Sequence, residues 1–174
     1  QMGQFQYLGQ NLVAAHAYAQ QALDQALGIY GSDHREVAGS YNLVGVILKD
    51  TGDLAGARPY LERALVIRER ALGPDHPDTA QSLNNLGLLL QDMGDLAGAR
   101  PYLERALAIR EQVLGPDHPS TAASFNNLAI LRYYEDNLPE AARLMRRALA
   151  IWENVLGPDH PHTQGSRSSL AVID

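Results

Sequence analysis

A five-residue segment, Gly-Pro-Asp-His-Pro, recurs along this chain at a fixed interval and constrains the fold more than any other feature. It begins at Gly73, Gly115 and Gly157, so the interval is 42 residues both times (115 − 73 and 157 − 115). A partial copy of the segment, Gly-Ser-Asp-His, begins at Gly31, which is 42 residues before Gly73. A fixed period of roughly 20 to 50 residues is typical of solenoids, in which each unit packs against its neighbours. The sequence therefore predicts stacked copies of one structural unit.

Each 42-residue unit contains the pattern of two helices, which we name A and B in chain order. In the second full unit, Leu83, Leu86 and Leu90 recur at helical spacing and predict helix A. Gly94-Asp95 then ends A and caps B, whose own apolar stripe stops at Gly115. The predicted helices cover residues 1–9, 11–29, 35–51, 53–72, 78–93, 95–114, 120–135, 137–156 and 162–174.

Small residues occupy fixed columns of the repeat. Gly3, Gly45 and Gly87 share one position of helix A, and the fourth unit has Ala129 there. Glycine inside a helix costs about 1 kcal/mol relative to alanine. Its recurrence therefore predicts that a neighbouring backbone approaches helix A closely at this column. We expect Pro59 and Pro101, inside the B helices, to produce a kink on the outer side, and Trp152 to be a packing residue.

The repeated segments resemble the tetratricopeptide repeat. They read Asn-Asn-Leu-Gly at 84–87, Gly-Asp-Leu-Ala-Gly-Ala at 94–99 and Leu-Glu-Arg-Ala-Leu at 103–107. The 42-residue length and the Leu-Gly-Pro-Asp-His-Pro connector resemble the kinesin-light-chain-like subclass, which is common in bacterial multidomain proteins. The resemblance covers essentially the whole chain. It implies an all-α, right-handed superhelical solenoid of antiparallel helix pairs, whose A helices line an inner wall that mostly binds peptides or proteins.

The repeat register predicts a single array over residues 1–174. It consists of a partial repeat 1–34, the repeats 35–76, 77–118 and 119–160, and a C-terminal capping helix 161–174. Because the register runs through both ends, we expect the chain to be an excerpt of a longer array or a shortened one. The repeat 119–160 departs most from the others, because Asp136-Asn137 replaces the Gly-Asp turn and Arg132 replaces an apolar residue.

A stripe beside the apolar face of each A helix is the predicted partner-binding surface. Asparagines recur in it once per repeat, and their amides can hold the backbone of an extended peptide. The alternative is that the asparagines hydrogen-bond neighbouring repeats. The two tyrosines at 133 and 134 are either contact residues or packing for the next A helix. The predicted binding residues are Asn42, Val46, Lys49, Gln81, Asn84, Asn85, Leu88, Gln91, Asn126, Asn127, Ile130, Tyr133 and Tyr134.

Composition and motifs argue against several function classes. The net charge of −6 and the presence of a single lysine, Lys49, argue against a nucleic-acid partner. Some members of the family clamp a C-terminal carboxylate with several basic residues, and a stripe with one lysine does not match them. His76, His118 and His160 lie in successive repeats, about a helix diameter apart, so we expect turn and capping roles rather than a shared metal ion. There is no cysteine and no catalytic motif. We expect no enzyme activity, cofactor or metal, no membrane span and a cytoplasmic location.

Two hypotheses of different class follow. The first is a non-catalytic scaffold that binds an extended peptide or a partner protein on the A-helix wall. The second is a structural, regulatory or self-associating sensor arm of a larger signalling protein, such as a nucleotide-dependent switch ATPase. A third, an engineered repeat protein, is suggested by residues 52–77 and 94–119, which differ at only three positions. The divergence of the other repeats favours a natural array.

Overall fold

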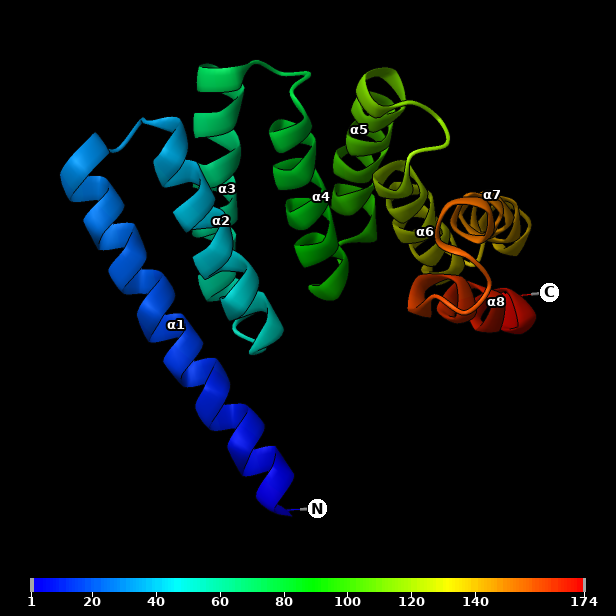
Figure 1. Ribbon diagram of the computed structural model, residues 1–174, viewed down its shortest axis with the longest axis horizontal. Coiled ribbons are helices and arrows are strands. Elements are labelled where there is room, and N and C mark those ends of the chain that lie inside the picture. Colours follow the sequence, from blue (N-terminus) through cyan, green and yellow to red (C-terminus); the bar gives the residue numbers. More distant parts are fainter. Residues whose placement is uncertain (1, 174) are drawn as a thin grey trace. The chain divides into compact units, whose positions relative to one another are not determined.

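The fold is described by a computed structural model, which defines the backbone of residues 2–173 and the side chains of residues 14–173. Every element in the described part is an α-helix, as the sequence predicts. The helices are α1 (Met2–Tyr30), α2 (Arg35–Asp50), α3 (Leu54–Leu72), α4 (Pro77–Asp92), α5 (Leu96–Leu114), α6 (Pro119–Tyr134), α7 (Leu138–Leu156) and α8 (Pro161–Ile173) (Figure 1). They form two compact units, an N-terminal unit of residues 1–89 and a C-terminal unit of residues 90–174.

In the N-terminal unit, α2 packs against both α1 and α3 (Figure 1). One apolar cluster of this unit is built from α1 and α2 and contains the buried residues Leu23, Val37 and Val44. In the C-terminal unit, α6 packs against α5 and α7, and α8 packs against α7. Each unit thus buries the apolar faces of consecutive helices against one another, as expected when helix pairs stack along the chain.

The turn inside each repeat requires a residue with a left-handed backbone. Gly52 and Gly94 supply it with φ of 89° and 82°, and Asp136 adopts φ of 60° in the third full repeat. Glycine takes this conformation without steric cost, and Asp tolerates it better than most residues. The Asp or Asn that follows each turn caps the next helix through its side-chain oxygen, as when Asp53 Oδ1 accepts a hydrogen bond from Gly56 N at 2.9 Å.

The first helix corrects the sequence prediction. We expected helices over 1–9 and 11–29, whereas α1 runs without a break from Met2 to Tyr30. The repeat register places Gln10 where Gly52 and Gly94 stand in the other turns. Glutamine pays the full steric penalty of positive φ, so the helix continues instead of turning.

The glycine column of the A helices confirms the predicted close approach at Gly45. A Cβ added to Gly45 would lie 2.7 Å from two side-chain carbons of Leu61 and 3.3 Å from the backbone oxygen of Ala57, both in α3. Gly87 is buried at the equivalent position, while Gly3 lies outside the residues whose side chains are described. Pro59 and Pro101 occupy exposed positions inside the uninterrupted helices α3 and α5. Their predicted kink stays a prediction.

Connectors between repeats are closed by two side chains. In all four, a histidine Nδ1 accepts a hydrogen bond from the backbone N–H two residues later, at 3.0 to 3.3 Å, as predicted for a capping role; the residues are His34, His76, His118 and His160. In the last three, a threonine hydroxyl donates to the connector glycine oxygen at 2.8 or 2.9 Å; the residues are Thr79, Thr121 and Thr163. Both sets of bonds therefore join residues that are close to one another in sequence.

Candidate partner-binding surface

The predicted stripe residues lie on α2, α4 and α6, with differing exposure. On α2, Asn42, Val46 and Lys49 are half-buried. On α4, Asn84 and Asn85 are buried, Leu88 and Gln91 are half-buried, and Gln81 is exposed. On α6, Asn126, Asn127 and Ile130 are half-buried, whereas Tyr133 and Tyr134 are exposed. The two tyrosines are thus the exposed aromatic residues of the set.

The asparagines of the N-terminal unit are bonded to each other across neighbouring repeats. Asn85 Nδ2 donates to Asn42 Oδ1 at 2.8 Å, and Gln81 Nε2 donates to Asn85 Oδ1 at 3.0 Å. This is the arrangement that the alternative interpretation of the asparagine column describes. On α6, Asn126 Nδ2 lies 3.5 Å from the Asn127 oxygen, the longest contact of the group. Amide groups already bonded to one another must exchange partners before they bind a peptide.

Lys49 has an anionic partner on its own helix. Its Nζ lies 2.9 Å from Asp50 Oδ1, and the lysine side chain is only 19% exposed. The positive charge of the stripe is therefore neutralised locally. The expectation that the chain differs from the carboxylate-clamping members of the family stays a prediction.

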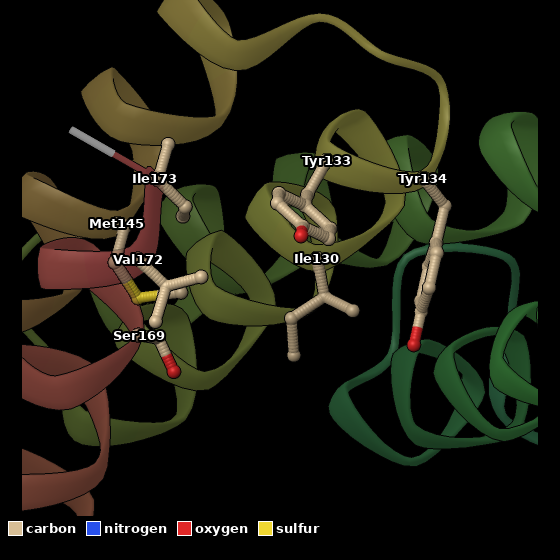
Figure 2. Close-up of a pocket in the computed structure, with 7 residues that line it drawn as sticks. All are labelled: Ile130, Tyr133, Tyr134, Met145, Ser169, Val172 and Ile173. Atoms are coloured by element: carbon tan, nitrogen blue, oxygen red, sulfur yellow. The ribbon is translucent and has the colours of Figure 1, made fainter.

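Three predicted residues come together at a pocket of the C-terminal unit, which we name the tyrosine pocket. Ile130, Tyr133 and Tyr134 from α6 form one side, and the remaining lining comes from α7 and α8 (Figure 2). The volume is about 190 Å³, and the other lining residues are Met145, Ser169, Val172 and Ile173. The rings of Tyr133 and Tyr134 meet edge to face with their centroids 5.9 Å apart.

Val172 is a lining residue that the sequence analysis missed. It stands in the same repeat column as Val46, Leu88 and Ile130, and it is 72% exposed. Extending that column by one more period would have identified it. Ser169 and Ile173 come from the same helix, so α8 contributes part of the pocket as well as covering α7.

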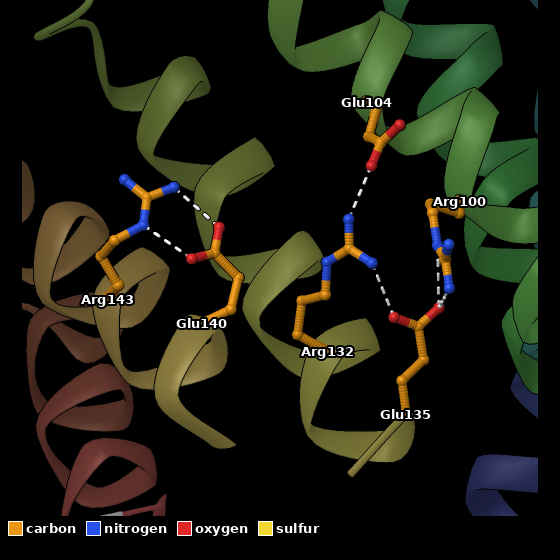
Figure 3. A network of polar contacts seen from close by, with 6 residues as sticks. All are labelled: Arg100, Glu104, Arg132, Glu135, Glu140 and Arg143. Atoms are coloured by element: carbon orange, nitrogen blue, oxygen red, sulfur yellow. Dashed lines mark hydrogen bonds and ion pairs between the residues drawn. The ribbon is translucent and has the colours of Figure 1, made fainter. Parts of the chain in front are cut away.

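An ion-pair network holds the carboxyl end of α6, where the two tyrosines lie. Glu135 is the C-cap residue of α6, and its carboxylate accepts hydrogen bonds from Arg100 of α5 at 2.7 Å and from Arg132 at 2.8 Å. Arg132 also donates to Glu104 of α5 at 2.7 Å, so its guanidinium bridges the two carboxylates (Figure 3). Arg132, which replaces an apolar residue of the repeat, therefore has a structural role, because it joins α6 to α5 through Glu104.

The surroundings of Glu135 also shift the pKa of its carboxyl. Partial burial alone would raise the pKa of its carboxyl, but the hydrogen bonds and positive charges of Arg100 and Arg132 outweigh burial and hold the pKa below its ordinary value. The nearby Glu140–Arg143 pair, joined by two hydrogen bonds of 2.7 Å, likewise lowers the pKa of Glu140. Both carboxylates are consequently charged near neutral pH.

A second repeated strut joins α3 to α4 and α5 to α6. Arg68 donates to Ser82 Oγ at 2.9 Å, and Arg110 donates to Ser124 Oγ at 2.7 Å. Burial lowers the pKa of both guanidinium groups, although nearby Asp78 opposes this at Arg68. In the last repeat Trp152 stands in the arginine column. Among the described side chains, the equivalent Ser166 Oγ is therefore buried without a hydrogen-bond partner.

Trp152 is a packing residue, as predicted. It is buried, its Nε1 donates to Pro119 O at 3.3 Å, and its ring stacks on His162 with centroids 5.0 Å apart. Within the described residues, no group of three or more His, Cys, Asp or Glu side chains is arranged to hold a metal ion. No helix in the described part of the chain is both long and apolar enough to cross a membrane.

Comparison with known families identifies the fold. The sequence profile of the tetratricopeptide repeat matches residues 36–111 and, overlapping them, residues 83–154. The chain belongs to the tetratricopeptide repeat family. No curated protein matches the sequence significantly.

Solved structures agree with this assignment. BtubC (BKLC) from P. vanneervenii is similar with a TM-score of 0.81 and 23% identity over 94% of this chain. A kinesin-light-chain-type protein of Podosopora anserina with nearly identical TPR-like repeats has a TM-score of 0.78 and 26% identity over 98% of this chain, which spans 80% of that protein. The all-α repeat solenoid and the kinesin-light-chain-like subclass are thus confirmed.

A Rap protein solved in complex with the Competence and Sporulation Factor is also similar. Its TM-score is 0.79, with 19% identity over 99% of this chain, which spans 46% of that protein. The present chain covers 65% of the length of BtubC (BKLC). At these identities the likeness to BtubC (BKLC) and to the Rap protein concerns the fold.

Proposed function

We propose that this tetratricopeptide repeat chain is a non-catalytic protein-interaction scaffold that binds an extended peptide, or an extended segment of a partner protein, on the exposed stripe of its A helices. The observation that carries the proposal is the tyrosine pocket, where Tyr133 and Tyr134 are 41% and 59% exposed beside Val172. Exposed apolar and aromatic side chains gathered at a concavity mark interaction sites. Tyrosine is favoured in such sites because it buries much area at little cost in conformational entropy.

Within this proposal the residues of the predicted stripe have two different roles. Ile130, Tyr133 and Tyr134 are the contact residues, because they line a pocket and leave surface accessible. Asn42 and Asn85 act as a strut between repeats, because each amide is already bonded to the other. Asn126 and Asn127, which are half-buried on the same helix as the two tyrosines, provide polar contacts to the peptide backbone. The Rap protein, which has the same fold, was solved in complex with the Competence and Sporulation Factor, and this complex supports a binding role for the fold.

A direct test is a peptide-array screen with the full chain, followed by titration of the best binders. Replacing Tyr133 and Tyr134 together by alanine should weaken binding at least about tenfold, because buried aromatic contacts often contribute 2 kcal/mol or more. Tyr18→Ala is the matched control, since this tyrosine is 73% exposed on α1. Equal binding by the double variant and the control would contradict the proposal.

The second candidate is a structural or regulatory arm, and the surface of α1 favours it. Tyr18, Ile29 and Tyr30 are exposed on this helix, and exposed apolar side chains of this kind suit packing on another domain or another copy. Ile29→Asp should then abolish any concentration-dependent association seen by sedimentation velocity. A chain that stays monomeric over the accessible concentration range, with or without this substitution, would count against self-association.

A further inference from the structure

We propose that the tyrosine pocket holds one large aliphatic or aromatic side chain of a partner peptide whose flanking residues are basic. This inference rests on the proposed function and adds the chemistry of the partner. It concerns only the C-terminal unit, because α6, α7 and α8 supply every lining residue.

The size of the pocket fits a single side chain. Its volume of about 190 Å³ lies below the range of roughly 300–1,000 Å³ that is usual for sites of drug-sized ligands and cofactors. A small-molecule site of ordinary size is therefore disfavoured. One anchoring residue of an extended peptide can fill such a volume while its backbone runs along the surface.

The lining of the pocket selects an apolar anchor. None of the seven lining side chains carries a charge. Three of them carry a hydroxyl, namely Tyr133, Tyr134 and Ser169, and the other four are purely apolar. A charged group placed there would lose its hydration without gaining an ion pair. Met145 is fully buried beneath the pocket, and its flexible thioether can adapt to anchors of different shape. Figure 2 shows Ile130 and Tyr133 facing Met145 and Val172.

A negative charge two residues beyond the lining residue Tyr134 favours basic flanking residues. Asp136 lies two residues beyond Tyr134 and is exposed, and among the described side chains none forms an ion pair with it. Neighbouring Glu135, in contrast, is neutralised by two arginines. The chain as a whole carries a net charge of −6. Complementary charge increases association rates and selects partners, so lysine or arginine next to the anchor matches this surface.

The experiment uses the full chain and fluorescent peptides built on one glycine–serine backbone. The reference probe has a central leucine with two lysines on each side. A second probe replaces the leucine by alanine, and a third replaces the lysines by glutamates. We expect the alanine probe to bind about ten- to fiftyfold more weakly, from the apolar surface that leucine buries. The glutamate probe should bind more weakly still, and low salt should widen that difference.

Protein variants test whether the anchoring side chain of the peptide binds in the tyrosine pocket. Val172→Glu should weaken the leucine probe at least about tenfold, because it puts a charge on the pocket wall. The high exposure of Val172 keeps the fold unaffected. Val155→Glu, at a 48% exposed position of α7 outside the lining, is the matched control. Asp136→Asn should cost about two- to fivefold for the lysine probe only, since asparagine keeps the left-handed backbone.

The results test the pocket, the charge preference and the proposed function separately. Probes that bind the chain but ignore the central residue, or bind Val172→Glu as well as Val155→Glu, would overturn the pocket while leaving the proposed function in place. A preference for glutamate flanks would refute the charge argument. Dimerisation that Val172→Glu abolishes would show that a second copy occupies the pocket. Binding of array peptides that Tyr133→Ala and Tyr134→Ala do not affect would instead refute the proposed function.

Discussion

The close contact at Gly45 gives the sharpest test of how the helix pairs pack. The change is Gly45→Ala, compared with Gly39→Ala on the same helix α2. At Gly39 an added Cβ would have no described atom within 4 Å, apart from its own helix backbone and chain neighbours, whereas at Gly45 it would lie 2.7 Å from Leu61. Leu61 is fully buried and Val44, beside the glycine, is too, so the leucine has little room to move aside.

The two substitutions share one energy term and differ in another. Both replace a helical glycine by alanine, which stabilises a helix by about 1 kcal/mol. Only Gly45→Ala adds overpacking, which typically costs about 1–3 kcal/mol. Gly39→Ala should therefore stabilise the chain by about 1 kcal/mol, while Gly45→Ala should be neutral or destabilising by up to about 2 kcal/mol, from the same two terms.

Urea unfolding followed by circular dichroism measures this difference. Repeat arrays can unfold in stages, so hydrogen exchange of the α2 and α3 amides should accompany it and localise the effect. In thermal unfolding, 1 kcal/mol corresponds to about 2–4 °C for a chain of this size. If Gly45→Ala stabilises the chain as much as Gly39→Ala does, glycine is not required by packing at this column and the reasoning is refuted.

Three further predictions concern single polar contacts. His118→Ala should destabilise the chain by about 0.5–2 kcal/mol in urea titrations, because α6 loses its N-cap acceptor. His118→Asn should lose much less stability, since asparagine can also cap a helix. Equal destabilisation by the two variants would refute the capping role. Ser124→Ala should cost about 1 kcal/mol by removing the Arg110 partner, while Ser166→Ala should be neutral or stabilising because its hydroxyl has no described partner; the reverse order would contradict this. Because folding lowers the pKa of Glu135, the unfolded chain binds more protons in acid, and the stability that Glu135 contributes above its ordinary pKa of 4.5 is lost as the pH falls below it. Glu135→Gln should therefore make the urea midpoint fall less as the pH is lowered. A pH profile equal to that of the unsubstituted chain would refute this.

The helices were predictable from the sequence where turn chemistry is strong. Gly52 and Gly94 mark positive φ, and the connector histidines mark helix starts, so the predicted boundaries from residue 35 onward lie within one or two residues of the observed ones. The same reasoning failed at Gln10, because the repeat register was extended to a position without a turn-forming residue. Periodicity alone cannot ensure a turn when the residue that makes it is missing.

The candidate site was only partly predictable, because it depends on contacts between helices. Tyr133 and Tyr134 were recognised from their place in the stripe, but the pocket also needs Val172 from α8. The bond between Asn42 and Asn85 joins residues 43 positions apart. Nothing in the residue types distinguishes that strut from a peptide-binding amide, since both uses need the same donors and acceptors. The Ser166 hydroxyl likewise becomes exceptional only once Trp152 is seen in the arginine column.

The connectors have a consequence for how such a chain can grow. Each threonine hydroxyl bonds a glycine six residues earlier, and each histidine caps an N–H two residues later. Because both partners of every bond lie inside one short segment, a duplication or deletion of 42 residues carries the whole joint with it. The near-identity of residues 52–77 and 94–119 is what a recent duplication of this kind would leave. Array length can thus change by whole units without any joint having to be rebuilt.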